Sequence, residues 1–329
     1  MDATQNEKLF YGSQVKILKR TKELNIYELK NETGYAIMKS YHLFDGIDLI
    51  YNDINMNKIS NDLCMPPGFF EVNHCQEGRI ECEFNRECLY LTKDDFSINR
   101  KDGTCHKSYF PLSHYYGISI CINIKKAQIE IDRYFESNFI NIKSLCDKLC
   151  GESGFMLMKS NESIGHIFAE LYSIPEKIKF QYFKIKVLEV ILFLSTLDGN
   201  NTEKRSYYSK RQVDKIKDIQ KYITKNIEKK YTLDELSENY NIGLTTMKQC
   251  FKGVYGENIY SYIRRFRMEL AAEKLMGSDN TILEIANSVG YENGSKFAAA
   301  FKNVIGISPK KFRTLKNKKE VYNYTKITE

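Results

Sequence analysis

The chain has 329 residues, of which 42% are hydrophobic, and carries a formal net charge of +7. This length and apolar content suit two domains with real hydrophobic cores. The start is polar, without the apolar segment of a secretory signal. The longest apolar stretch, residues 187–197, is far shorter than the ~20 residues of a membrane span. We therefore expect a cytoplasmic protein whose nine cysteines are reduced thiols.

Basic residues concentrate toward the C-terminus. Residues 204–329 contain 25 Lys and Arg against 14 Asp and Glu, whereas residues 1–203 contain 24 against 28. A basic segment behind a mildly acidic body indicates that the C-terminal part meets a polyanion, although lysine-rich helices are often only solvated surfaces.

The first 125 residues predict a β-rich domain. Residues 1–30 read as a polar lead, helical or loosely ordered. From residue 34 to 124, short apolar runs alternate with period two between turn residues such as Pro66 and Pro67, a pattern typical of strands. Regularly spaced strands favour a small β-sandwich or barrel. We expect this domain to be the sensor.

Helical periodicity replaces strand periodicity over residues 126–197. Phe168 and Leu171 fit one helix, residues 183–194 fit another, and Pro175 separates the two. The second helix is apolar on more than one face, so it is buried on several sides or forms a subunit interface. We assign 126–197 to dimerisation or relay, 198–212 to a linker, 213–316 to the basic domain and 317–329 to a tail. The fold class is therefore multidomain α+β with an all-α C-terminal domain.

A short phrase occurs twice in the basic domain. Residues 251–256 read FKGVYG and residues 301–306 read FKNVIG, 50 residues apart; residues 232–237 (TLDELS) are likewise repeated as 281–286 (TILEIA). Two copies are too few for a solenoid, which needs roughly three repeats. A duplicated helix-turn-helix, over residues 232–254 and 281–304, is the better interpretation.

Each copy contains the local signals of this motif. Thr232 with Glu235, and Thr281 with Glu284, form capping boxes that begin helices 233–240 and 282–288. Asn241 and Gly290 can adopt the left-handed conformation of a tight turn. Second helices are predicted over 244–254 and 294–304, and a linking helix over 258–276.

The second helix of each copy has an apolar and a polar face. Met247 and Phe251 point inward in the first, Phe297 and Phe301 in the second. The opposite faces suit base edges and phosphates in a major groove. They carry Thr245, Thr246, Lys248, Gln249, Lys252, Ser295, Lys296, Ala299 and Lys302. A linking helix that holds the two roughly 34 Å apart would let one monomer read two successive groove segments.

These residues resemble the AraC/XylS family of bacterial transcription regulators. The likeness runs from about Val213 to Arg313 and is carried mainly by the second unit: Ile285, Ala286, Gly290, Tyr291, Ser295, Phe297, Ala300, Phe301, Lys302, Gly306, Ile307, Ser308 and Pro309. The middle helix adds Tyr262, Arg267, Met268, Ala271, Ala272 and Leu275. The resemblance implies two helix-turn-helix subdomains, binding to double-stranded promoter DNA and usually activation through RNA polymerase.

Two positions depart from the family pattern. Gly243 stands where the first recognition helix often begins with Ser, and Ala299 stands where a long polar residue is common. Alanine can touch a thymine methyl group but cannot hydrogen-bond guanine. We therefore expect Lys248 and Gln249 to carry more base discrimination than the second helix. Lys252, Lys296 and Lys302 are then phosphate contacts, which position without specifying.

The N-terminal half is similar to the sensor half of a branch of the same family that includes siderophore-responsive regulators. The pattern comprises Phe44, Gly46, Ile47, Leu49, Ile50, Tyr51, Asn52 and Asp53, then Glu71, Val72, Asn73, His74, Cys75, Gly78, Arg79 and Glu81. It implies a cupin-like β domain that binds a small-molecule effector, such as an iron chelate. The pattern does not identify the effector-binding residues, and it leaves monomer and homodimer both open.

Two other hypotheses remain. One is a thiol- or metal-dependent enzyme fused to a DNA-binding module, and the other is a scaffold whose helical units contact only proteins. Structural zinc sites use paired cysteines spaced by two to four residues, and only Cys146 and Cys150 have that spacing, without a second pair. The adjacent pairs His74–Cys75 and Cys105–His106 form no recognised ligand motif. We therefore predict no catalytic residue, no cofactor and no metal.

Overall fold

The computed structural model describes residues 3–63, 66–84, 87–101, 103, 106–136, 139–160, 162–198 and 208–315. The chain divides into two compact units, Met1–Tyr207 and Tyr208–Glu329. Most of the predicted linker and all of the predicted tail 317–329 lie outside the described residues.

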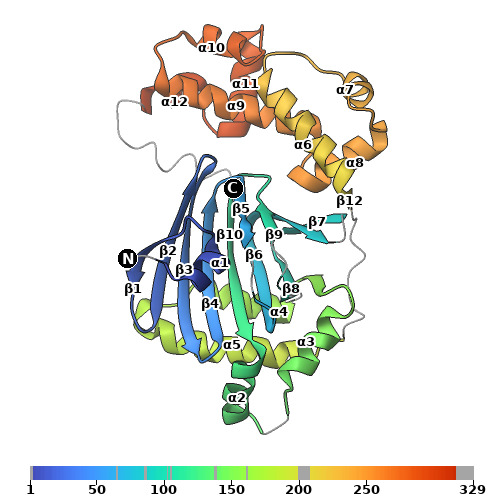
Figure 1. Cartoon of the computed structure of the whole chain (residues 1–329). Coiled ribbons are helices and arrows are strands. Elements are labelled where there is room, and N and C mark those ends of the chain that lie inside the picture. The colour runs from blue at the N-terminus through green and yellow to red at the C-terminus, as the bar shows by residue number, and fades with distance from the viewer. Residues whose placement is uncertain are drawn as a thin grey trace. The chain divides into compact units, whose positions relative to one another are not determined.

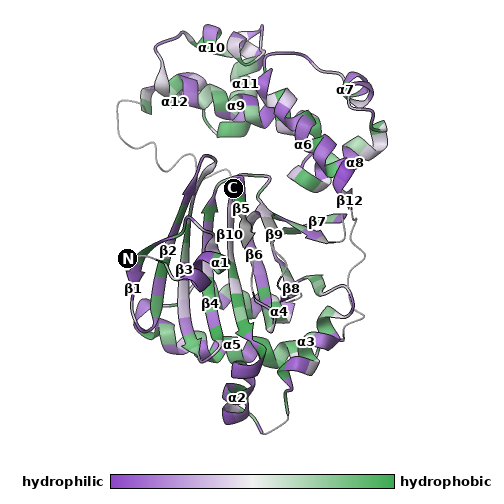
Figure 2. Ribbon diagram, in the orientation of Figure 1, coloured by the Kyte–Doolittle hydropathy of each residue, from purple (hydrophilic) through white to green (hydrophobic). Residues whose placement is uncertain are grey.

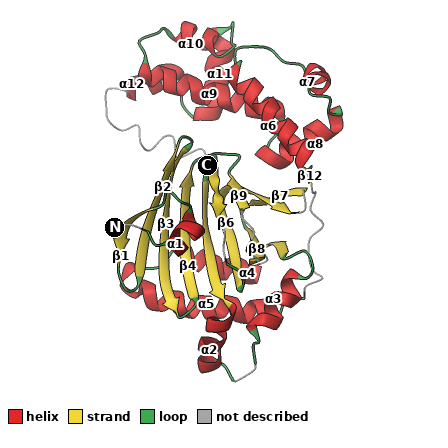
Figure 3. Ribbon diagram, in the orientation of Figure 1, coloured by secondary structure: helices red, strands yellow, loops and turns green. Residues whose placement is uncertain are grey.

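The first unit combines a large antiparallel sheet with helices (Figures 1 and 3). Its strands are β1 (Lys16–Arg20), β2 (Leu24–Asn31), β3 (Gly34–Phe44), β4 (Ile47–Asn55), β5 (Lys58–Leu63), β6 (Phe69–Phe84), β7 (Glu87–Thr92), β8 (Asp95–Lys101), β9 (His106–Tyr109), β10 (Tyr115–Asn123) and β11 (Phe155–Lys159). Its helices are α1 (Gln5–Tyr11), α2 (Ile124–Tyr134), α3 (Ile142–Cys150), α4 (Glu162–Tyr172), the short 3₁₀ helix η1 (Glu176–Ile178) and α5 (Lys179–Ser195).

Neighbouring strands pair in the order β1-β2-β3-β4-β10-β6-β7, while β8 joins β6 to β11 and β9 joins β6 to β5. The long strand β6 changes partners along its length. Residues 69–74 pair with both β10 and β8, and residues 79–84 pair with β7. A register shift between Tyr116 and Gly117 marks the change, and Gly78 lies there with φ +79°. The backbone can bend at this point because residue 78 is a glycine. A Cβ at this position would lie 2.1 Å from the His114 carbonyl oxygen, so a larger residue would clash.

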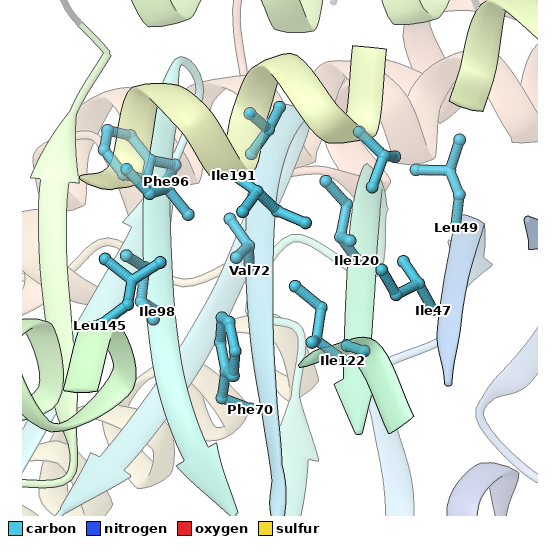
Figure 4. Packing of buried hydrophobic residues seen from close by; sticks show 14 of the residues in the cluster. Ile47, Leu49, Phe70, Val72, Phe96, Ile98, Ile120, Ile122, Leu145 and Ile191 are labelled. Carbon is cyan, nitrogen blue, oxygen red and sulfur yellow. The ribbon is translucent and has the colours of Figure 1, made fainter. Parts of the chain in front are cut away.

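Both faces of the sheet are buried. Leu49 and Tyr51 pack toward α3, α4 and α5, whereas Ile50 and Ile54 pack on the opposite side with α1. Figure 4 shows Ile120 and Ile122 of β10 in the first cluster, with Ile191 of α5 above them. This explains why β10 is apolar over most of its length, as its colouring in Figure 2 shows.

The predicted α+β class and the β-rich N-terminal part are confirmed. Pro175 does separate two helices, α4 and α5. The expectation of a helical or loose lead over residues 1–30 is wrong, because only α1 is helical and β1 and β2 extend the sheet. The alternation typical of strands is weak in β1 and β2, because most of their residues are polar and only Ile17, Tyr27 and Leu29 are buried. Strand β11 also interrupts the stretch expected to be helical, pairing with β8.

The second unit is helical apart from the short strand β12 (Tyr208–Ser209). It comprises α6 (Lys210–Lys225), α7 (Leu233–Asn239), α8 (Leu244–Tyr255), α9 (Ile259–Gly277), α10 (Ile282–Ser288), α11 (Gly294–Ile305) and α12 (Pro309–Thr314). The predicted all-α C-terminal domain is confirmed. Across the described residues of both units, no helix combines the length and apolarity needed to cross a bilayer.

His74 is a structural residue of the first unit. It is 3% exposed, its ring stacks on Phe168 at 4.2 Å, and Nδ1 lies 3.1 Å from the Tyr172 hydroxyl. Burial lowers the pKa of His74 to about 4, because the imidazolium form would lose its hydration. The histidine is therefore neutral in the folded protein at neutral pH.

This burial predicts a pH dependence. The unfolded chain binds a proton at His74 near pH 6.5, whereas the folded chain binds it only near pH 4. The folded state therefore loses stability as pH falls through that window, by up to about 3 kcal/mol. Urea unfolding of the native chain and of His74→Asn should show the variant losing this component. His166→Asn, an exposed control, should retain it, and equal pH slopes for all three chains would contradict the prediction.

Candidate nucleic-acid interface

The first helix-turn-helix consists of α7 and α8. The Thr232 N–H donates to Glu235 Oε2 at 3.0 Å, and the Glu235 N–H donates to Thr232 Oγ1 at 3.2 Å. Asn241 has φ +46°, and the Ser237 hydroxyl donates to the Ile242 carbonyl at 2.6 Å. The predicted capping box and left-handed turn are therefore both present. Together they fix the direction in which α8 leaves the turn.

The second helix-turn-helix consists of α10 and α11 and repeats these features. The Thr281 N–H donates to Glu284 Oε2 at 2.6 Å, and the Glu284 N–H donates to Thr281 Oγ1 at 3.2 Å. Gly290 has φ +82°, as predicted. One difference lies at the start of the recognition helices. The Asn293 side chain caps α11 by accepting from the Lys296 N–H at 2.9 Å, whereas Gly243 gives α8 no side-chain cap.

The recognition helices bury one face and expose the other. Met247, Phe251, Phe297 and Phe301 are each 0% exposed. Of the residues predicted to touch DNA, Thr246 is half-buried and the others are exposed: Thr245, Lys248, Gln249, Lys252, Ser295, Lys296, Ala299 and Lys302. Within the described part of the chain, these four lysines form no ion pair with a carboxylate, so their charge is available to a phosphate.

Helix α9 joins the two helix-turn-helix units through buried contacts. Ile259, Tyr262 and Ile263 are buried near its start, and the Tyr262 hydroxyl accepts from Gln220 Nε2 of α6 at 2.7 Å. At its end, Leu275 belongs to a core formed with α10, α11 and α12. The linking helix therefore contributes to the core of both units.

Arg267 of α9 forms a second link. Its Nε donates to the Ile227 carbonyl at 2.9 Å and Nη2 donates to the Lys229 carbonyl at 2.6 Å. Its guanidinium carbon lies 5.8 Å from the centre of the Tyr291 ring. One side chain thus holds both the loop before the first helix-turn-helix and an aromatic residue from the turn of the second helix-turn-helix. The partial burial of Arg267 lowers the pKa of its guanidinium.

Gly290 completes this junction. A Cβ at Gly290 would lie 2.6 Å from the Glu228 carbonyl oxygen and 2.8 Å from Arg267 Nη2. The turn of the second helix-turn-helix therefore lies so close to the loop before the first that a side chain at Gly290 would clash with it. An exposed ion pair between Lys230 and Glu292, at 2.9 Å, lies alongside. We define the junction as residues 227–230, Arg267 and 290–292. The sequence predicts a role for Gly290 in the turn but not its contact with Arg267.

A surface hollow of about 420 Å³ lies beside the exposed face of α8. It is lined by Lys248, Gln249, Lys252, Leu233, Asn258, Ile259 and Tyr260. Tyr260 is 54% exposed and was not among the predicted site residues. The exposure of Tyr260 can be recognised only once the packing of α9 is known, so the sequence gives no signal for it.

Of the described side chains weighed for an enzyme, those of His74, Cys75, Cys146 and Cys150 are buried. Burial raises the pKa of the Cys75 and Cys121 thiols, and that of Cys82 to about 12, which opposes formation of a nucleophilic thiolate. Cys146 and Cys150 are buried on α3. Cys105 lies outside the described residues.

Three potential metal ligands lie close together in the β-rich unit. Glu81, Glu83 and Cys88 bring their potential ligand atoms within 4.8 Å of one another. The Glu81 carboxylate already accepts a hydrogen bond from the Tyr90 hydroxyl at 2.8 Å, and Glu83 is exposed. We therefore assign these residues no metal.

The helix-turn-helix segment is similar in sequence to known proteins. Residues 236–314 match a helix-turn-helix domain family. A Streptomyces lividans protein named "Putative AraC-like transcription regulator" is 35% identical over 83 residues, covering 25% of this chain and 27% of that protein. The bifunctional transcriptional activator/DNA repair enzyme AdaA of Bacillus subtilis is 32% identical over 108 residues, covering 33% and 51%. The Msm operon regulatory protein of Streptococcus mutans is 28% identical over 297 residues, covering 87% and 99%.

The C-terminal unit is thus a double helix-turn-helix domain. Through this unit the chain is similar to AraC-like transcription regulators. The matched segment is about a quarter of the length of the first of these relatives and about half of the second.

The junction predicts unequal costs for two glycine substitutions. Gly290 and Gly306 have nearly the same left-handed φ, +82° and +87°, but nothing lies within 4 Å of a Cβ at Gly306. Gly306→Ala should therefore cost only backbone strain, about 1 kcal/mol, whereas Gly290→Ala adds a clash with the Glu228 carbonyl and should cost at least about 2 kcal/mol. Thermal unfolding of both variants measures the difference. Equal losses would show that the junction does not constrain Gly290.

Proposed function

We propose that this protein is a sequence-specific DNA-binding transcription regulator whose β-rich unit responds to a small-molecule effector. The observation that carries the proposal is the pair of recognition helices, each buried on its apolar side and exposing short polar, amide and lysine side chains on the other. Such faces suit a major groove, and the junction supports a fixed separation between them.

The exposed residues divide by chemistry. Lys248 and Gln249 can hydrogen-bond base edges, so we propose that α8 carries most of the base discrimination. Lys252, Lys296 and Lys302 then bind phosphates, while Thr245, Thr246 and Ser295 supply shorter polar contacts. Ala299 can offer only a methyl contact to thymine. Because α8 exposes more groups that can hydrogen-bond bases than α11, we expect stronger sequence preference in the DNA segment that α8 contacts.

The remaining assignments belong to the same proposal. Residues 1–125 sense the effector, 126–197 dimerise or relay, 198–212 link, and 213–316 bind promoter DNA, with RNA polymerase as a further partner. The names of the relatives, among them a transcriptional activator and an operon regulatory protein, favour regulation of transcription. The DNA repair activity in the name of AdaA belongs to that protein. The raised pKa values of the Cys75 and Cys82 thiols weigh against a reactive cysteine at these two positions.

DNA binding can be tested without knowing the promoter. Duplexes selected by the full chain from a random pool serve as the probe, and their binding is measured across a salt series. The logarithm of the binding constant should fall with the logarithm of salt concentration, with a slope that reflects several phosphate contacts. A flat slope, or no enrichment of any sequence, would contradict the proposal.

Two lysine variants separate the proposed roles. Lys248→Ala should cost about 1–3 kcal/mol on the selected duplex and much less on others, because a base contact is lost. Lys302→Ala should weaken all duplexes alike and reduce the salt slope by about 1.

Lys221→Ala is the matched control for these variants. Lys221 lies on α6 beside Asp218, at 3.3 Å, and should change neither specificity nor slope. If Lys248→Ala weakened every duplex equally, α8 would not be the discriminating helix.

A further inference from the structure

Recognition helix α8 has a glycine in its interior where α11 has a larger residue. The duplicated phrase reads FKGVYG in α8 and FKNVIG in α11, so Asn303 is the equivalent of Gly253. Glycine inside a helix is destabilising relative to alanine, and it often marks a place where another group approaches the backbone closely. The difference between the two copies therefore indicates a neighbour that α8 has at this position.

That neighbour is Tyr208 of β12, which lies beside α8 (Figure 1). A Cβ at Gly253 would lie 2.3 Å from Cε2 of the Tyr208 ring and 2.5 Å from both its Cζ and its hydroxyl oxygen. The same hydroxyl donates to the Gln249 carbonyl at 3.3 Å, one turn earlier on α8. We call the surface of α8 between Gln249 and Gly253 the Gly253 notch. The equivalent residue of α11, Asn303, is exposed.

Tyr208 is held in place by the helix that follows it. It is the first residue of the second unit and directly precedes α6. The Ser209 N–H donates to Gln212 Oε1 at 3.0 Å, and the Gln212 N–H donates to Ser209 Oγ at 3.3 Å, which completes a capping box. Val213 and Ile216 are buried, and α6 packs against α8. The cap and the packing together direct the Tyr208 ring into the notch.

The notch adjoins the face of α8 that we assign to DNA. Gln249, whose carbonyl accepts the Tyr208 hydrogen bond, also carries one of the two side chains proposed to read bases. Lys252, proposed to bind a phosphate, directly precedes Gly253. A binding side chain acts only if its backbone is held within about 0.5 Å of the productive position, which is the task of the groups behind it. Tyr208 supports the backbone of α8 at this point.

We propose that Tyr208 is a positioning residue for DNA recognition, which holds α8, and not α11, in the orientation that presents Gln249 to a base. The inference rests on the proposed function, because it takes α8 as a DNA-reading helix. Tyr208 acts through α8 and needs no contact with DNA of its own. Loss of its contact should therefore reduce discrimination in the DNA segment that α8 contacts and leave the segment of α11 unchanged.

A double-mutant cycle in the full chain tests the contact, with the selected duplex as the probe. Gly253→Ala forces the ring out of the notch, and Tyr208→Ala removes the ring, so each should weaken binding about 10-fold. Alanine is the better helix former, so once the ring is gone Gly253→Ala should be neutral or favourable. The double variant should thus bind no more weakly than Tyr208→Ala. Losses that simply multiply would show that the two residues do not act through one contact and would overturn the proposal.

Two further variants serve as controls. Asn303→Ala makes the matching change on α11 and should leave affinity within about twofold of native, whereas Tyr208→Phe keeps the ring and should retain most of the affinity. Equal losses from Asn303→Ala and Gly253→Ala would mean that this helix position touches DNA in both units, which contradicts a role through Tyr208.

The base preference of Gly253→Ala gives a readout that a merely structural role would not move. When the selection from a random pool is repeated with this variant, preference should relax in the segment that Lys248→Ala also relaxes and persist in the other. Relaxation in both segments, or in neither, would contradict the assignment of Tyr208 to α8.

Amide hydrogen exchange without DNA separates this inference from the proposed function. In Tyr208→Ala, residues 249–255 of α8 should exchange at least about 5-fold faster, while the equivalent residues 299–305 of α11 keep their native rates. A native chain that binds no duplex would refute the proposed function, and the role of Tyr208 in recognition with it. A native chain that binds, with Tyr208→Ala binding equally well and exchanging at native rates in α8, would overturn this inference alone.

Discussion

The Arg267 guanidinium is the contact on which the geometry of the C-terminal unit depends most. It binds two carbonyls of the loop before α7 and lies over Tyr291 from the turn after α10. Loss of this side chain would leave the part-buried Ile227 carbonyl without its donor, at a cost of about 1–3 kcal/mol, whereas water can reach the exposed Lys229 carbonyl. Lysine would not replace it, because a single ammonium lacks the fork that reaches both carbonyls. Arg267 and the close approach at Gly290 thus add to the buried contacts of α9 in setting the relative position of α8 and α11.

Much of this unit was predictable because its determinants are local. The capping boxes at Thr232 and Thr281 and the positive φ at Asn241 and Gly290 each depend on residues within one or two turns of the chain. The repeat made them visible twice, so each copy supported the interpretation of the other. The role of Arg267 was not predictable in the same way, because its carbonyl partners lie 38 and 40 residues away in the chain. The sequence shows this arginine only as part of the family pattern.

The N-terminal unit was less predictable for the same reason. Strand β11 pairs with β8 more than 50 residues earlier, so its place in the sheet depends on contacts that no local pattern encodes. Residues of β1 and β2 are mostly polar, and only their pairing with each other and with β3 makes them strands. The aromatic residues Tyr51, Phe70 and Phe110 are buried in the hydrophobic clusters.

The face that a helix leaves exposed indicates its partner better than the face it buries. Helices α5, α8 and α11 all bury a similar apolar stripe, so burial alone does not distinguish them. On α8 and α11 the exposed face carries lysines and short polar groups, which keep their hydration until a polyanion replaces it. On α5 it carries Ile185 and Leu192, which offer a polyanion no charge. One chain therefore uses the same helical periodicity for two kinds of surface, and only the lysine-bearing kind should bind DNA in a salt-dependent way.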